Sequence, residues 1–143
     1  MNTNSESDAH AKVLVVDDEP AILMTLKKIL QYAGYEVQTA QSGREGLNVF
    51  QQRQWDLVTL DRSMPDMNGE EVATKMKQMA PNVPIIMITG FTNAVVRPEL
   101  FDAVVAKPFR PAELLERFAQ ALGKHSGGTG PLPQSRAAGS ICA

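Results

Sequence analysis

The sequence predicts an α/β protein in which five parallel strands form one doubly wound sheet with helices on both faces. Two observations lead to this fold class. Short apolar runs of strand length alternate with segments whose apolar residues recur at helical spacing, a pattern typical of parallel sheets. Three of these runs, at residues 13–16, 57–60 and 85–88, are almost wholly apolar, as central strands covered on both faces must be. Right-handed crossovers between such strands place helices on both sides of the sheet.

The first half of the chain contains three predicted strands, at about Lys12–Val16, Glu36–Ala40 and Asp56–Leu60. A helix is expected from about Glu19, because Pro20 suits a first helical position and Gly34 supplies a C-terminal stop. Apolar residues at helical spacing predict its core face, which consists of Ile22, Leu23, Leu26, Ile29, Leu30 and Ala33. Ser42 is the expected cap of a second helix, which contains Leu47 and Phe50.

The second half continues the alternation with two further strands, expected at Pro84–Ile88 and at about Val104–Ala106. A helix from about Gly69 to Met79 precedes them, and Pro81 stops it. This helix is expected to bury Val72, Met76 and Met79. The last helix starts near Pro111 and ends at Gly123, and it is expected to bury Leu114, Leu115, Phe118 and Leu122.

Composition excludes several classes of protein. The chain has 143 residues, enough for one domain with a proper core, and its formal net charge of −2 gives no electrostatic footprint for nucleic acid. No apolar run reaches the length of a membrane span, and the polar start, Met1–His10, has no signal-peptide region. The single cysteine, Cys142, excludes an internal disulfide and fits a reducing compartment. We therefore expect a cytoplasmic protein that binds neither nucleic acid nor membrane.

The two ends of the chain differ from the predicted domain, which covers residues 12–123. Residues 1–11 are polar and are expected to be disordered. Residues 124–143 are rich in Gly, Pro and Ser and cannot form a core, so they are expected to be flexible. This segment is a native tail, a linker to a missing domain, or a remnant of cloning, and the sequence does not separate these.

Polar residues stand just past four of the predicted strands. Asp17 and Asp18 follow the first strand, Asp61 the third, Thr89 the fourth and Lys107 the fifth. In a doubly wound sheet the site lies outside the carboxyl ends of the strands, where the strand order reverses. We therefore expect these five side chains to converge there.

This set of residue types suggests metal-assisted phosphoryl transfer. Adjacent acids repel each other, and a hard divalent cation such as Mg²⁺, which binds oxygen ligands, relieves that repulsion. Asp61 would be the nucleophile that forms an acyl phosphate, with Lys107 and the metal as the cations that such a transfer needs. Each residue also has a plainer interpretation: Asp17 or Asp18 as a helix cap, Asp61 as a turn residue, Lys107 as a surface lysine, and Thr89 as a strand residue.

Together these motifs resemble the receiver domain of two-component response regulators, over about residues 12–123. The resemblance rests on Val16-Asp17-Asp18-Glu19, on Asp61-Arg62-Ser63-Met64-Pro65 with Asn68-Gly69, on Thr89-Gly90, and on Lys107-Pro108-Phe109. It implies a flavodoxin-like sheet in the order 2-1-3-4-5. It also implies that the Lys107–Pro108 peptide bond is cis, a form largely confined to proline.

The resemblance assigns a role to each site residue. Asp61 would be the phosphoacceptor, Thr89 the switch hydroxyl and Lys107 the phosphate partner. Asp18 and Asp61 would bind the metal directly, Asp17 through water, and the backbone carbonyl of Ser63 would complete the protein ligands.

Two features depart from the family pattern. Val104 occupies the position, three residues before the lysine, where the family usually has an aromatic switch residue. Only 18 residues separate Thr89 from Lys107, and Pro98 lies between them. The fourth helix is therefore expected to be a stub starting near Pro98, or irregular.

The expected function is a signalling switch, not an enzyme, that receives a phosphoryl group from a histidine kinase or phosphotransfer protein and acts on an unknown protein by contact. It assists its own phosphoryl transfer and dephosphorylation. The chain would be a stand-alone receiver, which the Met1 start slightly favours, or a fragment of a larger hybrid kinase or regulator. A second interpretation is a binding module of the same fold that is regulated without phosphorylation. A phosphatase-like hydrolase lacks support, because Ser63 stands where its second acid would be.

Overall fold

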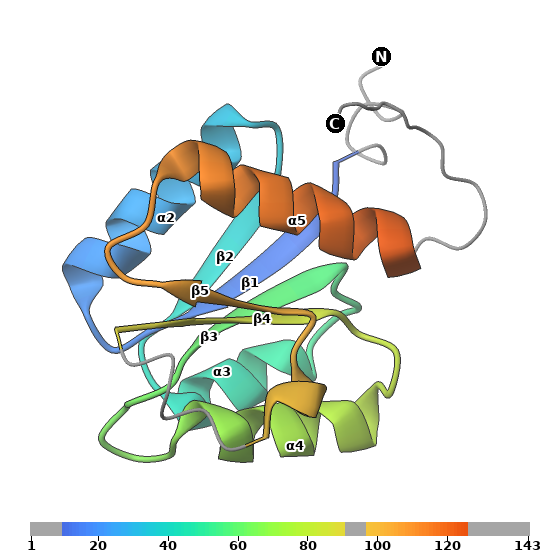
Figure 1. Ribbon diagram of the computed structural model, residues 1–143. Coiled ribbons are helices and arrows are strands. Elements are labelled where there is room, and N and C mark those ends of the chain that lie inside the picture. The colour runs from blue at the N-terminus through green and yellow to red at the C-terminus, as the bar shows by residue number, and fades with distance from the viewer. Residues whose placement is uncertain (1–9, 91–96, 126–143) are drawn as a thin grey trace.

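Five parallel strands form one sheet, in the order β2-β1-β3-β4-β5, in the computed structural model of the protein (Figure 1). The structure describes residues 10–90 and 97–125. The order confirms the doubly wound fold that the sequence predicts, with its reversal between β1 and β3. The strands are β1 (Lys12–Val16), β2 (Glu36–Ala40), β3 (Leu57–Asp61), β4 (Ile85–Thr89) and β5 (Ala103–Ala106).

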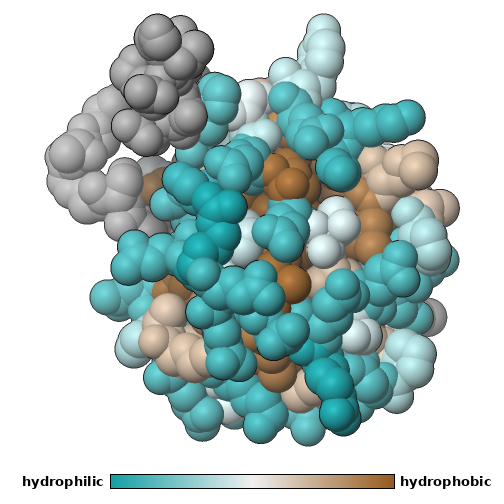
Figure 2. All heavy atoms as spheres, turned by 180° about the vertical axis from the view of Figure 1, so that it is seen from behind, coloured by the Kyte–Doolittle hydropathy of each residue, from teal (hydrophilic) through white to brown (hydrophobic). Residues whose placement is uncertain are grey.

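Helices cover both faces of the sheet, as predicted. Figure 1 shows α2 and α5 on one face and α3 and α4 on the other. Their bounds are α2 (Pro20–Tyr32), α3 (Gly43–Phe50), α4 (Gly69–Met79) and α5 (Pro111–His125). Seen from behind, hydrophilic residues cover most of the surface, and hydrophobic residues show in smaller areas among them (Figure 2).

The alternation of side chains along each strand divides the core in two. In β1, Val13 and Val15 pack toward α2 and α5, whereas Leu14 and Val16 pack toward α3 and α4. All four are almost completely buried. Because β1 and β3 are parallel neighbours in the sheet, their carboxyl ends lie side by side, with Val16 paired to Leu60.

The predicted boundaries of strands and helices agree with the structure to within one or two residues. Pro20 is the first residue of α2, Ser42 accepts a hydrogen bond from the backbone N–H of Glu45 as the cap of α3, and Gly34 has the positive φ of 101° expected of a C-terminal stop. The predicted end of the last helix at Gly123 is wrong, because α5 continues to His125. A glycine inside a helix costs only about 1 kcal/mol. The packing of the other residues of α5 offsets this cost, so the helix continues beyond Gly123.

Two residues assigned to the core are exposed. Ala33 is the C-terminal cap of α2, where the chain already turns toward Gly34 and helical periodicity no longer applies. Met79 is the last residue of α4 and is 45% exposed, because it borders a surface groove instead of the sheet.

The described part of the segment between β4 and β5, residues 97–102, contains one short turn of 3₁₀ helix, η2 (Pro98–Leu100). Its start at Pro98 confirms the predicted stub. Residues 91–96, which belong to the same predicted region, lie outside the described residues, as do residues 1–9 and 126–143 of the ends that were predicted to be loose. Among the described helices none is both long and apolar enough to cross a membrane.

Candidate functional site

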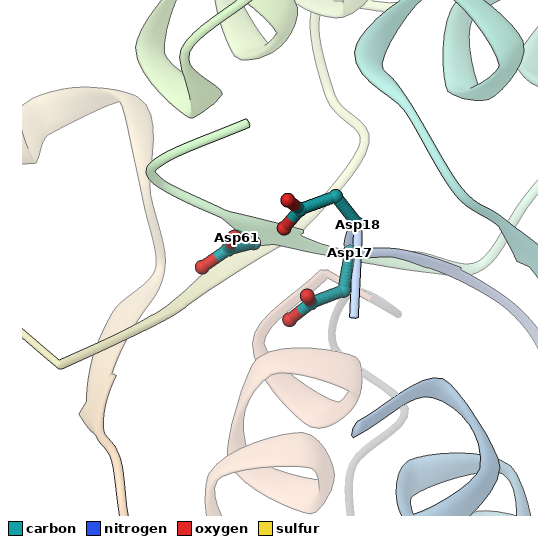
Figure 3. Close-up of side chains that lie close together, drawn as sticks. All are labelled: Asp17, Asp18 and Asp61. Carbon is teal, nitrogen blue, oxygen red and sulfur yellow. The ribbon is translucent and has the colours of Figure 1, made fainter. Parts of the chain in front are cut away.

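Three carboxylates meet at the carboxyl ends of β1 and β3. Asp17 and Asp18 directly follow β1, and Asp61 is the last residue of β3. One carboxylate oxygen from each lies within 4.8 Å of the others, and Figure 3 shows the three side chains gathered on one side of the strand ends. Asp17 and Asp61 are buried, at 2% and 7% exposure, and Asp18 is half-buried. The predicted convergence of the acids is therefore present.

Lys107 supplies the positive charge of this cluster. Its Nζ donates hydrogen bonds to Oδ2 of Asp17 at 3.0 Å and to Oδ1 of Asp61 at 3.1 Å. The backbone places it there, since the N–H of Lys107 donates to the carbonyl of Thr89 at 2.8 Å. The peptide bond from Lys107 to Pro108 is cis, as predicted.

A fourth acid approaches the same ammonium group. Oε1 of Glu19 lies 3.8 Å from Nζ of Lys107, and its side chain is 64% exposed. From the sequence, Glu19 has a place at the start of a helix and in the motif Val16-Asp17-Asp18-Glu19, but no predicted contact with the lysine. Its position as the third acid in a row was the one sequence signal for this contact. The direction of the Glu19 side chain depends on the turn after β1, where Oδ1 of Asp17 accepts a hydrogen bond from the backbone N–H of Glu19 at 2.9 Å.

Burial and like charge dominate the electrostatics of Asp61. Burial raises the pKa of Asp61 to about 6, and the negative charge of Asp17 acts in the same direction, while Lys107 lowers it. Burial alone would lower the pKa of Lys107. The hydrogen bonds and opposite charges of Asp17 and then Asp61 outweigh burial, so the pKa of Lys107 is raised. One lysine therefore offsets only part of the repulsion among the carboxylates.

The loop after Asp61 is fixed to helix α3 by Asp66. The carboxylate of Asp66 accepts hydrogen bonds from the backbone N–H groups of Gly43 at 3.1 Å and Arg44 at 2.8 Å. The bond from Arg44 is the main cause that lowers the pKa of Asp66. Asp66 thus caps a helix that begins 23 residues earlier in the chain. Sequence reasoning missed this contact because no local pattern pairs a loop with a distant helix end.

The same loop packs closely at Gly69, the first residue of α4. Its backbone N–H donates to the carbonyl of Arg62 at 2.8 Å, and a Cβ at this position would lie 2.6 Å from the carbonyl oxygen of Asp61. Glycine is therefore required by the close approach of two backbones. Asn68 caps α4 by accepting from the N–H of Glu71 at 2.8 Å.

A buried ion pair, also missed from the sequence, lies next to the predicted nucleophile. Nε of Arg62 is 3.4 Å from Oε1 of Glu70, whose side chain is 8% exposed. The predicted ligand Ser63 is exposed in the same loop, and its carbonyl remains a prediction.

Thr89 and Val104 lie on the β4 side of the cluster. Thr89 is buried at the end of β4 and pairs in register with Ala106. Val104 pairs with Met87 in the sheet and is half-buried. The position of the usual aromatic switch is thus a strand residue without a ring. The hydroxyl role of Thr89 remains a prediction.

Comparison with known proteins identifies the class of protein. The family model of the response regulator receiver domain matches residues 13–119. The chain therefore belongs to the response regulator receiver domain family of two-component systems, whose general function is phosphorylation-dependent switching. Receiver domains typically bind a divalent metal at an acidic cluster, and Asp17, Asp18 and Asp61 provide such a cluster here.

Similar proteins include a longer regulator and two solved receivers. Response regulator MprA of Mycobacterium sp. (strain KMS) is 34% identical over 84% of this chain and 54% of its own length. The CheY-like receiver domain protein of Methanospirillum hungatei JF-1 is 34% identical, with a TM-score of 0.79 over 82% of this chain and 98% of that one. Response regulator protein TrrA of Thermotoga maritima, in complex with Mg(2+)-BeF, is 38% identical, with a TM-score of 0.75 over 78% and 99%. The chain spans about half the length of the curated relatives it matches.

Proposed function

We propose that the chain is a signalling switch that accepts a phosphoryl group on Asp61 from a histidine kinase or phosphotransfer protein, with Mg²⁺ as cofactor. The observation that carries the proposal is the buried cluster of Asp17, Asp18 and Asp61 with Lys107 bonded across it. A single buried carboxylate could have a purely structural role in a turn. Three carboxylates with only one lysine leave negative charge that is not neutralised, which suits a cation.

The proposed reaction is an in-line displacement at phosphorus. A carboxylate oxygen of Asp61 forms the new P–O bond, the bond from phosphorus to the donor breaks, and the donor leaves with that electron pair. Asp17, Asp18, Asp61 and the carbonyl of Ser63 would hold Mg²⁺, which supplies positive charge to the phosphoryl oxygens. The relative TrrA, solved with Mg(2+)-BeF, supports this choice of ion.

The remaining site residues respond when the phosphoryl group arrives. Lys107 exchanges its bond to Asp61 for a phosphoryl oxygen, which keeps its charge paired. The hydroxyl of Thr89, at the end of the neighbouring strand, donates to another oxygen. With a pKa of about 6, Asp61 is mostly ionised and nucleophilic at neutral pH.

The output of the switch is contact with another protein. Because Val104 has no ring, the change at Thr89 passes directly into the segment Gly90–Asp102, of which residues 91–96 lie outside the described residues. In the described part of this segment no residue of the short helix η2 is buried, and segments with little buried surface shift at low cost. The chain acts in the cytoplasm, binds neither nucleic acid nor membrane, and catalyses no reaction beyond its own phosphorylation and dephosphorylation.

A second candidate is a receiver that forms part of a larger hybrid kinase or regulator. The observation in its favour is that the matched curated relatives are about twice as long as the matched region. A binding module that works without phosphorylation is the other alternative, and the short helix η2, in which no residue is buried, favours it.

Intact mass spectrometry after incubation with a small phosphodonor tests the proposal. The parent chain is expected to gain one phosphoryl group when Mg²⁺ is present and none in EDTA. Asp61→Asn should abolish the gain, whereas Asp56→Asn, at the other end of the same strand and exposed, should retain it. An unmodified parent chain in the presence of Mg²⁺ would favour the phosphorylation-independent module.

A further inference from the structure

A groove lies at the end of the sheet opposite the acid cluster. It has a volume of about 780 Å³, and eight of its thirteen lining residues are apolar. Trp55 enters it from the loop before β3, Met79 from the end of α4, and Leu122 from the last turns of α5. The proposed phosphotransfer site does not use this surface.

The charged groups at the groove are already paired within the protein. Arg53 bonds Glu36 at 3.1 Å and lies over the ring of Trp55 at 5.2 Å. Asp56 accepts from the backbone N–H of Lys12 at 2.7 Å. Because these charges are paired and eight of the thirteen lining residues are apolar, an occupant of the groove should present apolar side chains.

The C-terminal segment of the chain starts beside this groove. Leu122 lines the groove, α5 ends at His125, and residues 126–143 follow. Figure 1 shows the end of α5 on the side where the chain enters β3 and β4. The segment 131–133 reads Pro-Leu-Pro, and prolines favour an extended conformation that aromatic-lined grooves bind.

We propose that the Pro-Leu-Pro segment at 131–133 docks in this groove of the same chain, with Leu132 against the apolar lining that includes Trp55 and Met79. Only six residues, three of them glycine, separate His125 from Leu132. A chain of this length spans roughly 15 Å on average, and Leu122, three residues before the end of α5, already lines the groove. The polar segment 1–9, which precedes β1 in the chain, carries Glu6 and Asp8 and has no branched apolar residue.

A short link between a segment and its binding site raises the fraction of molecules in which a weak contact forms. A flexible link of a few residues gives a local concentration on the order of millimolar, so a segment with millimolar affinity is docked in about half of the molecules. Docking of this strength is reversible and leaves the groove available to a competing apolar peptide.

Trp55 reports on the groove directly, because it is the only tryptophan of the chain. Acrylamide quenching of its fluorescence in the full chain is the test. Leu132→Asp should raise the quenching constant about twofold, since about half of the molecules lose protection. Ala138→Asp adds the same charge to the same segment and should leave the constant unchanged.

A second pair of variants tests the groove from its own side. Met79→Lys should raise quenching as Leu132→Asp does, whereas Met24→Lys should not, because Met24, which is 60% exposed on α2, lies outside the groove. Equal quenching in the parent and Leu132→Asp would overturn the proposal. Protection that disappears on dilution would also overturn it, because a second copy would then be the occupant. No phosphodonor is needed, so the result is independent of the proposed phosphorylation.

Discussion

Replacement of Asp61 by Asn should stabilise the metal-free protein at neutral pH, although it removes the predicted nucleophile. The side chain of Asp61 is buried, and its pKa rises from an ordinary value of 3.8 to about 6. One pKa unit corresponds to about 1.4 kcal/mol, so ionising Asp61 in the folded protein costs up to about 3 kcal/mol relative to the unfolded chain. Asn resembles the protonated acid in shape and charge and avoids this cost.

The pH dependence gives the sign of the effect. Because the folded pKa is raised, the contribution of protonated Asp61 to stability is complete below pH 3.8 and is lost as pH rises through about 6. The difference in free energy of unfolding between Asp61→Asn and the parent should therefore be small near pH 4 and largest above pH 7. It should shrink again when Mg²⁺ is added, because the cation stabilises only the parent carboxylate.

Urea unfolding in EDTA at pH 4 and pH 8, followed by Trp55 fluorescence, measures this difference. Glu116→Gln is the control, because Glu116 is exposed on α5 and its loss removes the same charge. If Asp61→Asn is less stable than the parent at pH 8, the ion pair with Lys107 outweighs burial and repulsion, and the electrostatic account of the site is refuted.

Three further predictions address the metal, the loop and the signalling segment. Mg²⁺ at 100 times its Kd should stabilise the parent by about 2.7 kcal/mol and raise its Tm, and Asp18→Ala should weaken that response; an indifferent parent Tm would exclude the metal site. Gly69→Ala should cost about 1–3 kcal/mol, because its Cβ would meet the backbone of Asp61, whereas Gly123→Ala has open space and should gain up to about 1 kcal/mol; equal effects in urea unfolding would argue against the close approach. A phosphoryl mimic should change amide exchange most in Gly90–Asp102, and changes confined to other segments would contradict the proposed output.

The fold was predictable because local signals and the global topology agree. Pro20, Ser42 and Gly34 mark helix ends through their own backbone and side-chain chemistry, and the structure keeps each of them in that role. The apolar runs predicted which strands are central, because a strand covered on both faces needs apolar side chains on both. Predictions failed at helix ends: Gly123 lies inside α5, and Met79 faces a groove, because periodicity does not reveal where a helix passes the edge of the sheet.

The candidate site was predictable in its residue types but not in its contacts. Parallel strands bring residues at their carboxyl ends together, so the approach of Asp17, Asp18 and Asp61 follows from topology. The contacts of Glu19 with Lys107 and of Asp66 with helix α3 depend on loop conformation, which has no periodic signal. The strand pattern therefore predicted which acids meet, and the resemblance to receiver domains supplied their expected roles, but neither predicted the loop contacts that hold the site in place.

Identification of the phosphorylated residue tests the central claim most directly. After incubation with Mg²⁺ and a small phosphodonor, borohydride reduces an acyl phosphate to an alcohol, which converts a labelled aspartate into homoserine. Fragmentation mass spectrometry of the digested chain is expected to find homoserine at position 61 and aspartate at Asp17, Asp18 and Asp66. Homoserine at one of those three positions with Asp61 unchanged, or no conversion anywhere in the chain, would contradict the account.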